Sequence, residues 1–190
     1  MQTPSRRRPH ASLRAAAGAR RAPRFPPPRE PAVGGAERRL GEARGVFRAL
    51  TKYWNHVGIS KARKVRLFDV IVAPKSLYNL ESLWLLQADR QRLDSFQASC
   101  LRKILGIAHS YHSRVSNATV LSSARADRLS EALSKRQKQS YEKICSLPDT
   151  NYLRTLVCER GTNAPKQWHL VRRRGRPKLQ WAQCVYKLLQ

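Results

Sequence analysis

Apolar side chains recur at three- and four-residue steps along most of the chain after residue 35. That spacing places them on one face of a helix, so it predicts amphipathic helices. The pattern is clearest over residues 36–57, 88–105 and 127–145. In chain order, the expected inward positions of these helices are Leu40, Ala43, Val46, Phe47, Leu50, Trp54 and Val57, then Leu93, Phe96, Cys100, Leu101, Ile104 and Leu105, then Leu129, Leu133, Tyr141, Ile144 and Cys145.

The segment between the predicted helices 36–57 and 88–105 contains residues that typically start or end a helix. Ser60 is suited to accept a hydrogen bond from a backbone N–H of the next turn, so it is the expected N-cap of a second helix. This helix should run to about Ala73, because Pro74 ends or kinks a helix. Its expected inward side chains are Val65, Phe68, Ile71 and Val72. A short helix is expected next, carrying Leu77, Tyr78, Leu80, Trp84 and Leu85.

The same signals locate the remaining elements. Gly106 suits the left-handed turn that ends helix 88–105. Ser116 or Asn117 is expected to cap a short helix after the following loop. Residues 150–170 carry only a weak pattern, and the last helix is expected over about 178–189.

No segment alternates apolar and polar residues for long enough to predict a strand. The chain is therefore expected to be all-α, an irregular bundle of about five or six helices. Three parts are predicted: a disordered tail over 1–35, a helical region over 36–147, and a basic C-terminal arm with a terminal helix over 148–190.

The predicted tail differs in composition from the rest. Residues 1–35 hold eight arginines and one acid, together with seven of the eleven prolines. Large apolar side chains are nearly absent, so the segment buries too little surface to offset the entropy cost of ordering. Its Arg- and Ala-rich start is similar to an organelle transit peptide, although the prolines argue against a long amphipathic helix.

The net charge of +26 indicates what kind of partner the chain binds. Such a charge favours binding to a phosphate backbone, because each neutralised phosphate releases condensed counterions. An anionic membrane surface is the alternative, but no apolar run approaches the roughly 20 residues that span a bilayer. We therefore expect a nucleic-acid partner, RNA or DNA, with weak sequence preference, and no membrane partner.

The side chains that could carry catalysis or bind a metal do not form a recognisable site. His109 and His112 have no cysteine or carboxylate at metal-ligand spacing. The acids Glu81, Asp89, Asp94 and Glu131 lie among basic residues and are interpreted as surface ion-pair partners. No two of the four cysteines are close enough for a C-x-x-C motif, and all four are interpreted as small apolar residues. These cysteines are Cys100, Cys145, Cys158 and Cys184. No catalytic residue, metal or cofactor is expected.

Several short motifs occur in a fixed order along the chain. The residues that carry them are 46–50, 64–67, Leu77, Tyr78, Glu81, Trp84, Leu86, 92–107, Arg114 and Asn117, and finally 174–177 with Trp181. In this order they resemble the stretch just after the polymerase core of non-LTR retrotransposon reverse transcriptases. The last group is similar to a G-R-P-x-x-x-W signature near the end of such polyproteins. The order and joint presence of the motifs make the resemblance fairly specific.

The resemblance implies a thumb-like region over 36–147 that binds the backbones of template and primer. The polymerase palm of that family holds two metal ions on paired aspartates. No two acids are adjacent over residues 37–94, so the resemblance implies a non-catalytic fragment of a transposable element. An alternative is the product of a degenerate element with no selected function.

The basic run over residues 172–178 has several interpretations. It contains Arg-Gly-Arg-Pro, which is similar to the AT-hook core that lies in a narrow A·T minor groove. It also resembles a nuclear-localisation run, so a nuclear location is expected, with organelle targeting through the N-terminus as the alternative. Non-specific backbone contact is favoured over a solvated linker and over a small DNA- or chromatin-associated protein that uses an AT-hook. The candidate nucleic-acid-binding residues are Arg63, Lys64, Arg66, Arg102, Lys103, Arg172, Arg173, Arg174, Arg176 and Lys178.

Overall fold

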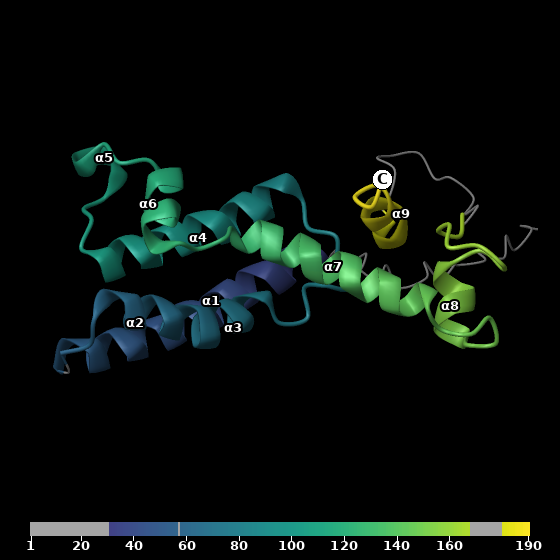
Figure 1. Cartoon of the computed structure of the whole chain (residues 1–190), viewed down its shortest axis with the longest axis horizontal. Coiled ribbons are helices and arrows are strands. Elements are labelled where there is room, and N and C mark those ends of the chain that lie inside the picture. Colours follow the sequence, from purple (N-terminus) through teal and green to yellow (C-terminus); the bar gives the residue numbers. More distant parts are fainter. Residues whose placement is uncertain (1–30, 57, 168–179) are drawn as a thin grey trace, which may run out of the picture.

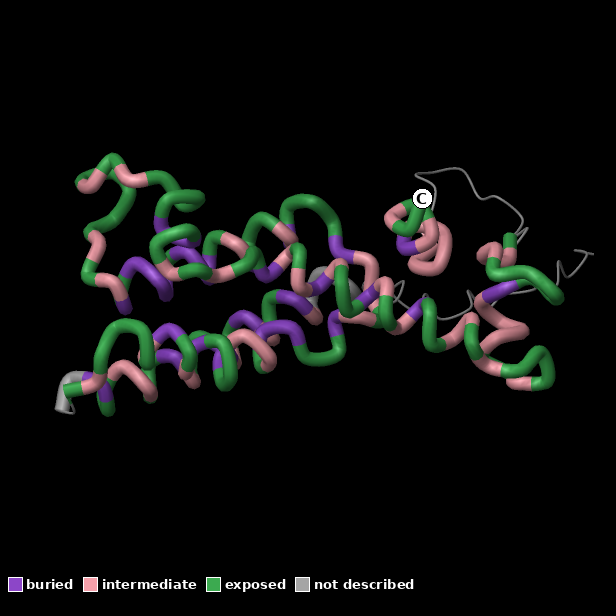
Figure 2. The backbone as a smooth tube through the Cα atoms, in the orientation of Figure 1, coloured by how far each residue is buried: buried purple, intermediate pink, exposed green. Residues whose placement is uncertain are grey.

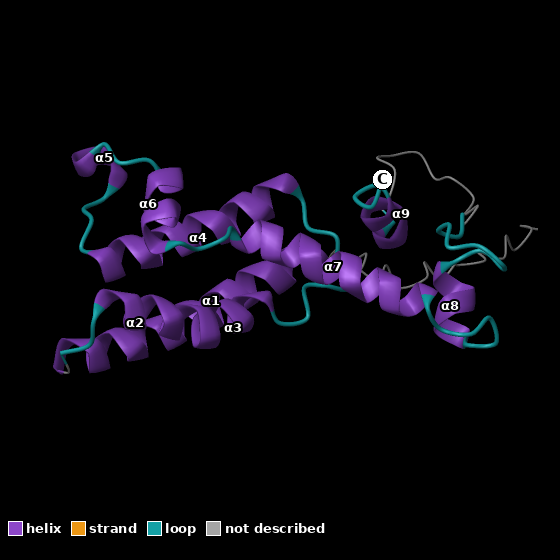
Figure 3. Ribbon diagram, in the orientation of Figure 1, coloured by secondary structure: helices purple, strands orange, loops and turns teal. Residues whose placement is uncertain are grey.

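The computed structural model describes residues 31–56, 58–167 and 180–190. Within these ranges every regular element is a helix, which confirms the all-α prediction (Figure 3). One isolated antiparallel bridge joins Cys158 to Pro165. The first helix begins at Pro31, within the last residues of the predicted tail. Proline tolerates this position because the first N–H groups of a helix have no intrahelical acceptor. The rest of the predicted tail lies outside the described residues.

The helices form two layers and an extension (Figure 1). The bounds are α1 Pro31–His56, α2 Lys61–Leu67, η1 Phe68–Val72, α3 Ala73–Leu77, α4 Gln87–Leu105, α5 Ser110–Ser113, α6 Asn117–Ala124, α7 Leu129–Cys145, α8 Tyr152–Val157 and α9 Trp181–Tyr186. The first layer pairs α1 with the returning run α2–η1–α3, and the second contains α4, α6 and the first half of α7. The far half of α7 extends beyond both layers and carries α8 and α9.

Aromatic rings link the two layers at the centre of the main core. The Phe68 ring lies 6.2 Å from that of Phe47 on α1 and 6.5 Å from that of Phe96 on α4. Phe47 also meets Trp54 edge-on at 5.8 Å. Buried positions of both layers belong to one cluster (Figure 2). The predicted apolar faces of α1, α4 and the first half of α7 are confirmed, except at Val57, which lies outside the described residues.

A π-helical turn carries the chain through Pro74 instead of ending the helix there. The Ala73 N–H bonds to the Phe68 carbonyl, five residues back, just before the proline that has no N–H to donate. The wider turn also rotates the residues that follow. Ile71, predicted to face inward, is 38 % exposed, whereas Val72 is fully buried.

The short helix predicted after α3 does not form. Residues 78–86 contain turns instead, and Asn79 adopts a left-handed conformation with φ of 57°. Leu80 and Leu85 are buried as expected, but Tyr78 is exposed, with the Arg39 guanidinium over its ring. The apolar residues of this segment have the spacing of a helix, but they belong to a loop that covers the core.

Side chains of α4 cap the start of α7. The Asp94 carboxylate accepts hydrogen bonds from the Ser130 N–H at 2.9 Å and the Ser130 hydroxyl at 2.7 Å. The Gln97 amide donates to the Asp127 carbonyl and accepts from the Leu129 N–H. Orphan N–H groups of α7 are therefore satisfied from another helix. Asp94 is a capping residue here and not the surface ion-pair partner that the sequence predicted.

A second, smaller core lies at the far end of α7. Tyr141, Cys158 and Val185 are buried there, and Trp84 and Trp181 pack against them. Residues of α7, of the 78–86 loop and of the predicted C-terminal arm all contribute to it. The helix α8 falls in the stretch that carried only a weak pattern.

Candidate nucleic-acid interface

The end where α1 finishes and α2 begins lies on the left of Figure 1, and the segments that meet there are rich in cations. Residues 43–68 hold seven Lys and Arg and no Asp or Glu, and no acid occurs over residues 95–126 either. The contact of α2 with α4 brings the last turns of α4 to the same end. We call the following set the basic end: Arg44, Arg48, Lys52, Lys61, Arg63, Lys64, Arg66 and Lys103. All are exposed except the half-buried Lys64.

The basic end is not neutralised by neighbouring acids. Each ion pair of the described residues involves other cations, on the acid-containing half of α1, on α3, and around α4, α7 and α8. None of the eight basic-end side chains pairs with a carboxylate in the part of the chain that the structure describes. An uncompensated cation keeps its full attraction for a phosphate, whereas a paired one must first give up its partner.

Two of the predicted residues come together from different helices. Lys64 of α2 and Lys103 of α4 line one small cavity of about 60 Å³, together with Thr51 and Trp54 of α1. The Lys64 ammonium lies 6.0 Å from the centre of the Trp54 ring. The charges of Lys103 and Arg44 both act on the buried Cys100 thiol and oppose the effect of burial on its pKa.

Arg63 and Arg66 lie on another face of α2. They line a shallow hollow with the exposed Val70, separate from the Lys64 and Lys103 cavity. Lys61 connects α2 to α4, because its ammonium donates to the Leu105 carbonyl at 2.9 Å, at the C-terminus of α4. The cations of the body therefore extend over more than one face of this end of the molecule.

The structure gives Arg102 a different role from the one predicted. Its side chain is 6 % exposed, and its guanidinium donates to four internal acceptors. These are the carbonyls of Ala108 and Val115, the Ser113 hydroxyl and the Asn117 side-chain oxygen. Arg102 thus holds the 106–117 segment against α4 and has no donor directed at a ligand. Its position beside the apolar stripe gave no sign of this, because the acceptors come from a loop.

The other candidate cations lie outside the described residues. These are Arg172, Arg173, Arg174, Arg176 and Lys178. The described residues on both sides of them are fixed to the second core. The Lys166 N–H bonds to the Val157 carbonyl at 2.8 Å, and the Trp181 indole N–H bonds to the Glu81 carbonyl at 2.8 Å.

The acids provide no metal site in the described residues, where no group of three or more His, Cys, Asp or Glu side chains comes together. Asp89 pairs with Arg92 at 3.4 Å, although it is buried and not at the surface as predicted, and Glu131 lies 4.0 Å from Arg128. Partial burial raises the pKa of Asp69, and the nearby charge of Asp127 raises it further.

The described helices include none with both the length and the apolar character needed to cross a bilayer. No protein-family model, curated protein or solved structure matches the chain. The resemblance to reverse transcriptases therefore remains a prediction from the motifs.

Proposed function

We propose that this chain binds the backbones of nucleic acids without catalysing a reaction, and that the basic end is the main contact surface of its helical body. The observation that supports the proposal is the set of eight cations from α1, α2 and α4 that meet at one end with no carboxylate partner among the described residues. The motif resemblance to the thumb-like region of a retrotransposon reverse transcriptase agrees with it.

The physical driving force is the release of counterions from the nucleic acid. Lysine and arginine side chains that approach phosphates displace condensed cations, whose dilution into bulk solvent favours binding. Phosphates are the same at every position, so contacts of this kind carry little sequence information. We therefore expect RNA and DNA to bind, single- or double-stranded, with weak sequence preference.

The experiment compares two fourfold variants that remove the same charge from different places. The first changes Arg63, Lys64, Arg66 and Lys103 to Ala. The matched control changes Lys135, Arg136, Lys138 and Lys143 of α7 to Ala. Affinity for duplex DNA is measured by fluorescence anisotropy at several salt concentrations, after circular dichroism confirms that both variants are helical.

The basic-end variant should reduce the log–log salt slope by roughly 3 to 4, because each phosphate that is no longer neutralised lowers the slope by about 0.9. The α7 control should reduce the slope less, because its four cations lie along one helix and not at the end where α1, α2 and α4 meet. Equal reductions in the two variants would show that total charge, and not the basic end, determines binding.

The basic run over residues 172–178 is tested separately, because the AT-hook interpretation predicts a preference for A·T-rich duplex. Arg174→Ala with Arg176→Ala should reduce affinity equally for A·T-rich and G·C-rich duplexes, with a slope change of roughly 2. A reduction confined to A·T-rich duplex would favour the AT-hook interpretation and a chromatin-associated role.

A further inference from the structure

Two cysteines that are thirteen positions apart in the sequence lie side by side in the second core. The sulfur of Cys145, at the end of α7, is 3.3 Å from that of Cys158, which follows α8. Both are free thiols. The Tyr141 hydroxyl, one turn back on α7, interacts with both sulfurs and donates to the Asn163 carbonyl at 2.8 Å.

The segments that carry the two thiols are held in place from both sides. Inside the 145–158 loop, Arg154 pairs with Asp149 at 2.6 Å and donates to the Leu147 carbonyl at 3.1 Å. Beyond the loop, the Glu159 N–H bonds to the Ala164 carbonyl next to the Cys158–Pro165 bridge. These contacts hold the two segments that carry the sulfurs in place on either side of them.

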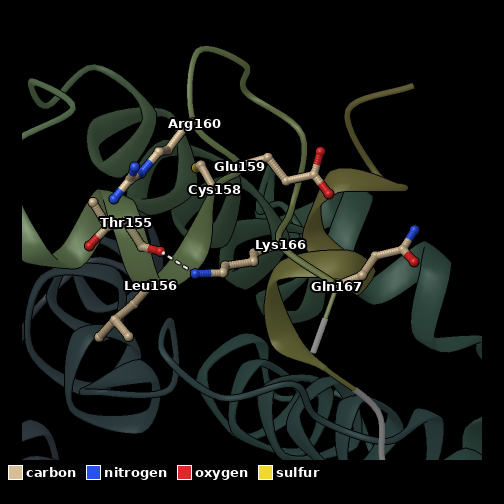
Figure 4. Close-up of a pocket in the computed structure, with 7 residues that line it drawn as sticks. All are labelled: Thr155, Leu156, Cys158, Glu159, Arg160, Lys166 and Gln167. Atoms are coloured by element: carbon tan, nitrogen blue, oxygen red, sulfur yellow. Dashed lines mark hydrogen bonds between the residues drawn. The ribbon is translucent and has the colours of Figure 1, made fainter. Parts of the chain in front are cut away.

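Cys158 also lines an open pocket of about 590 Å³, although the residue itself is only 2 % exposed. Figure 4 shows Thr155, Glu159, Arg160 and Lys166 around it, and the Lys166 ammonium donates to the Thr155 carbonyl at 3.2 Å.

We propose that Cys145 and Cys158 form a reversible disulfide, made by exchange with a small disulfide of the glutathione class. The site is a modification site independent of the nucleic-acid contact proposed above. It closes the 145–158 loop and ties the end of α7 to the segment that leads into the basic run.

The exchange proceeds in two balanced steps. The Cys158 thiolate attacks one sulfur of the small disulfide, whose S–S bond breaks and releases one small thiol, leaving a mixed disulfide on Cys158. The Cys145 thiolate then attacks the Cys158 sulfur, forms the internal S–S bond and releases the second small thiol. The two protons given up by the cysteines are carried away on the two small thiols, and two electrons pass from the protein to the small disulfide.

The other two cysteines have no such arrangement. Cys100 is buried between α1 and α4, and burial raises the pKa of its thiol to about 12. Cys184 lies on α9, where burial also raises the pKa of its thiol. Neither thiol contacts the sulfur of another cysteine in the described part of the chain. Burial raises the pKa of Cys145 to about 11, so the second step is expected to be slow at neutral pH and to depend on the proximity of the sulfurs.

The test uses the full-length protein, first reduced and then equilibrated with glutathione disulfide. Free thiols are trapped by alkylation, and peptides are identified by mass spectrometry. The expected product lacks two hydrogens and contains the Cys145 and Cys158 peptides joined together. It should exceed glutathione adducts on Cys100 or Cys184 by at least about tenfold, because a neighbouring thiol acts at an effective concentration in the millimolar range or above.

Serine variants identify the order of the steps. Cys145→Ser should stop at the mixed disulfide, with glutathione retained on Cys158, and Cys184→Ser should form the internal disulfide as the wild type does. Absence of the 145–158 linkage in the wild type, or a disulfide that includes Cys184, would overturn the proposal even if a serine variant failed to fold.

Discussion

The two cores of this molecule are built by different means. The first, between α1, η1, α4 and the start of α7, consists mainly of Leu, Val and Phe side chains. The second, around Tyr141, consists mainly of aromatic and cysteine side chains. Two of its aromatic side chains also donate hydrogen bonds to backbone carbonyls. The Tyr141 hydroxyl donates to the Asn163 carbonyl, and the Trp181 indole N–H donates to the Glu81 carbonyl. Apolar burial therefore dominates one core, whereas the other depends on polar contacts made by large side chains.

The largest effect should come from the aromatic centre of the first core. Phe68→Ala removes a fully buried ring between two others and should lower the free energy of unfolding by about 3–5 kcal/mol. Val70→Ala, two residues away and 73 % exposed, should change it by less than about 0.5 kcal/mol. Denaturant unfolding followed by circular dichroism measures both. Similar effects of the two substitutions would contradict the assignment of the core.

Arg102 and Lys103, neighbours at the end of α4, should affect different properties when each is changed to Ala: the free energy of unfolding and the salt dependence of binding. Arg102→Ala leaves four internal acceptors without their donor and should cost about 2–3 kcal/mol of unfolding free energy, with the salt slope of binding unchanged. Lys103→Ala, at the exposed neighbouring position, should have the opposite pattern: little change in stability and a slope reduced by roughly 0.9. A reduced slope in the Arg102 variant would restore that residue to the interface.

The polar character of the second core is tested by removing one oxygen atom. Tyr141→Phe keeps the ring but removes the hydrogen bond to the Asn163 carbonyl, and should cost about 1 kcal/mol. Tyr152→Phe provides the control, because Tyr152 is 73 % exposed and no change is expected there. If Tyr141→Phe is as stable as the wild type, the core is held by apolar packing alone.

The smallest effect concerns Asp69. An aspartate whose pKa is higher in the folded protein than in the unfolded chain costs stability as pH rises through the folded pKa. Asp69→Asn should therefore be slightly more stable than the wild type at neutral pH, by less than about 0.5 kcal/mol, with the difference vanishing in acid. Unfolding curves at neutral and acidic pH measure this difference, and a variant less stable at neutral pH would reverse the sign.

The contrast between the cores also explains how much of the fold could be predicted from the sequence. Long helices with a regular apolar face, such as α4, were predicted nearly to their ends, and Ser60, Gly106 and Ser116 cap helices as expected. The π turn before Pro74 and the loop over 78–86 were not predicted, because their residues follow helical spacing while neighbouring elements determine their conformation.

The candidate site was predicted only in part, for the same reason. Composition alone indicated that the chain is basic, and Arg63, Lys64, Arg66 and Lys103 are at the end where cations gather. The burial of Arg102 depends on acceptors in the 108–117 segment, and the meeting of Cys145 with Cys158 depends on a chain reversal after α8. Neither arrangement has a local sequence signature.

The most direct test of the central claim is the salt dependence of binding by the unmodified chain. Affinity for a duplex of mixed sequence is measured between about 50 and 200 mM monovalent salt. Four or more phosphate contacts at the basic end predict a log–log slope of roughly −4 or steeper, which weakens binding on the order of a hundredfold or more over this range. A slope close to zero would show that the cations do not contact phosphates and would contradict the account.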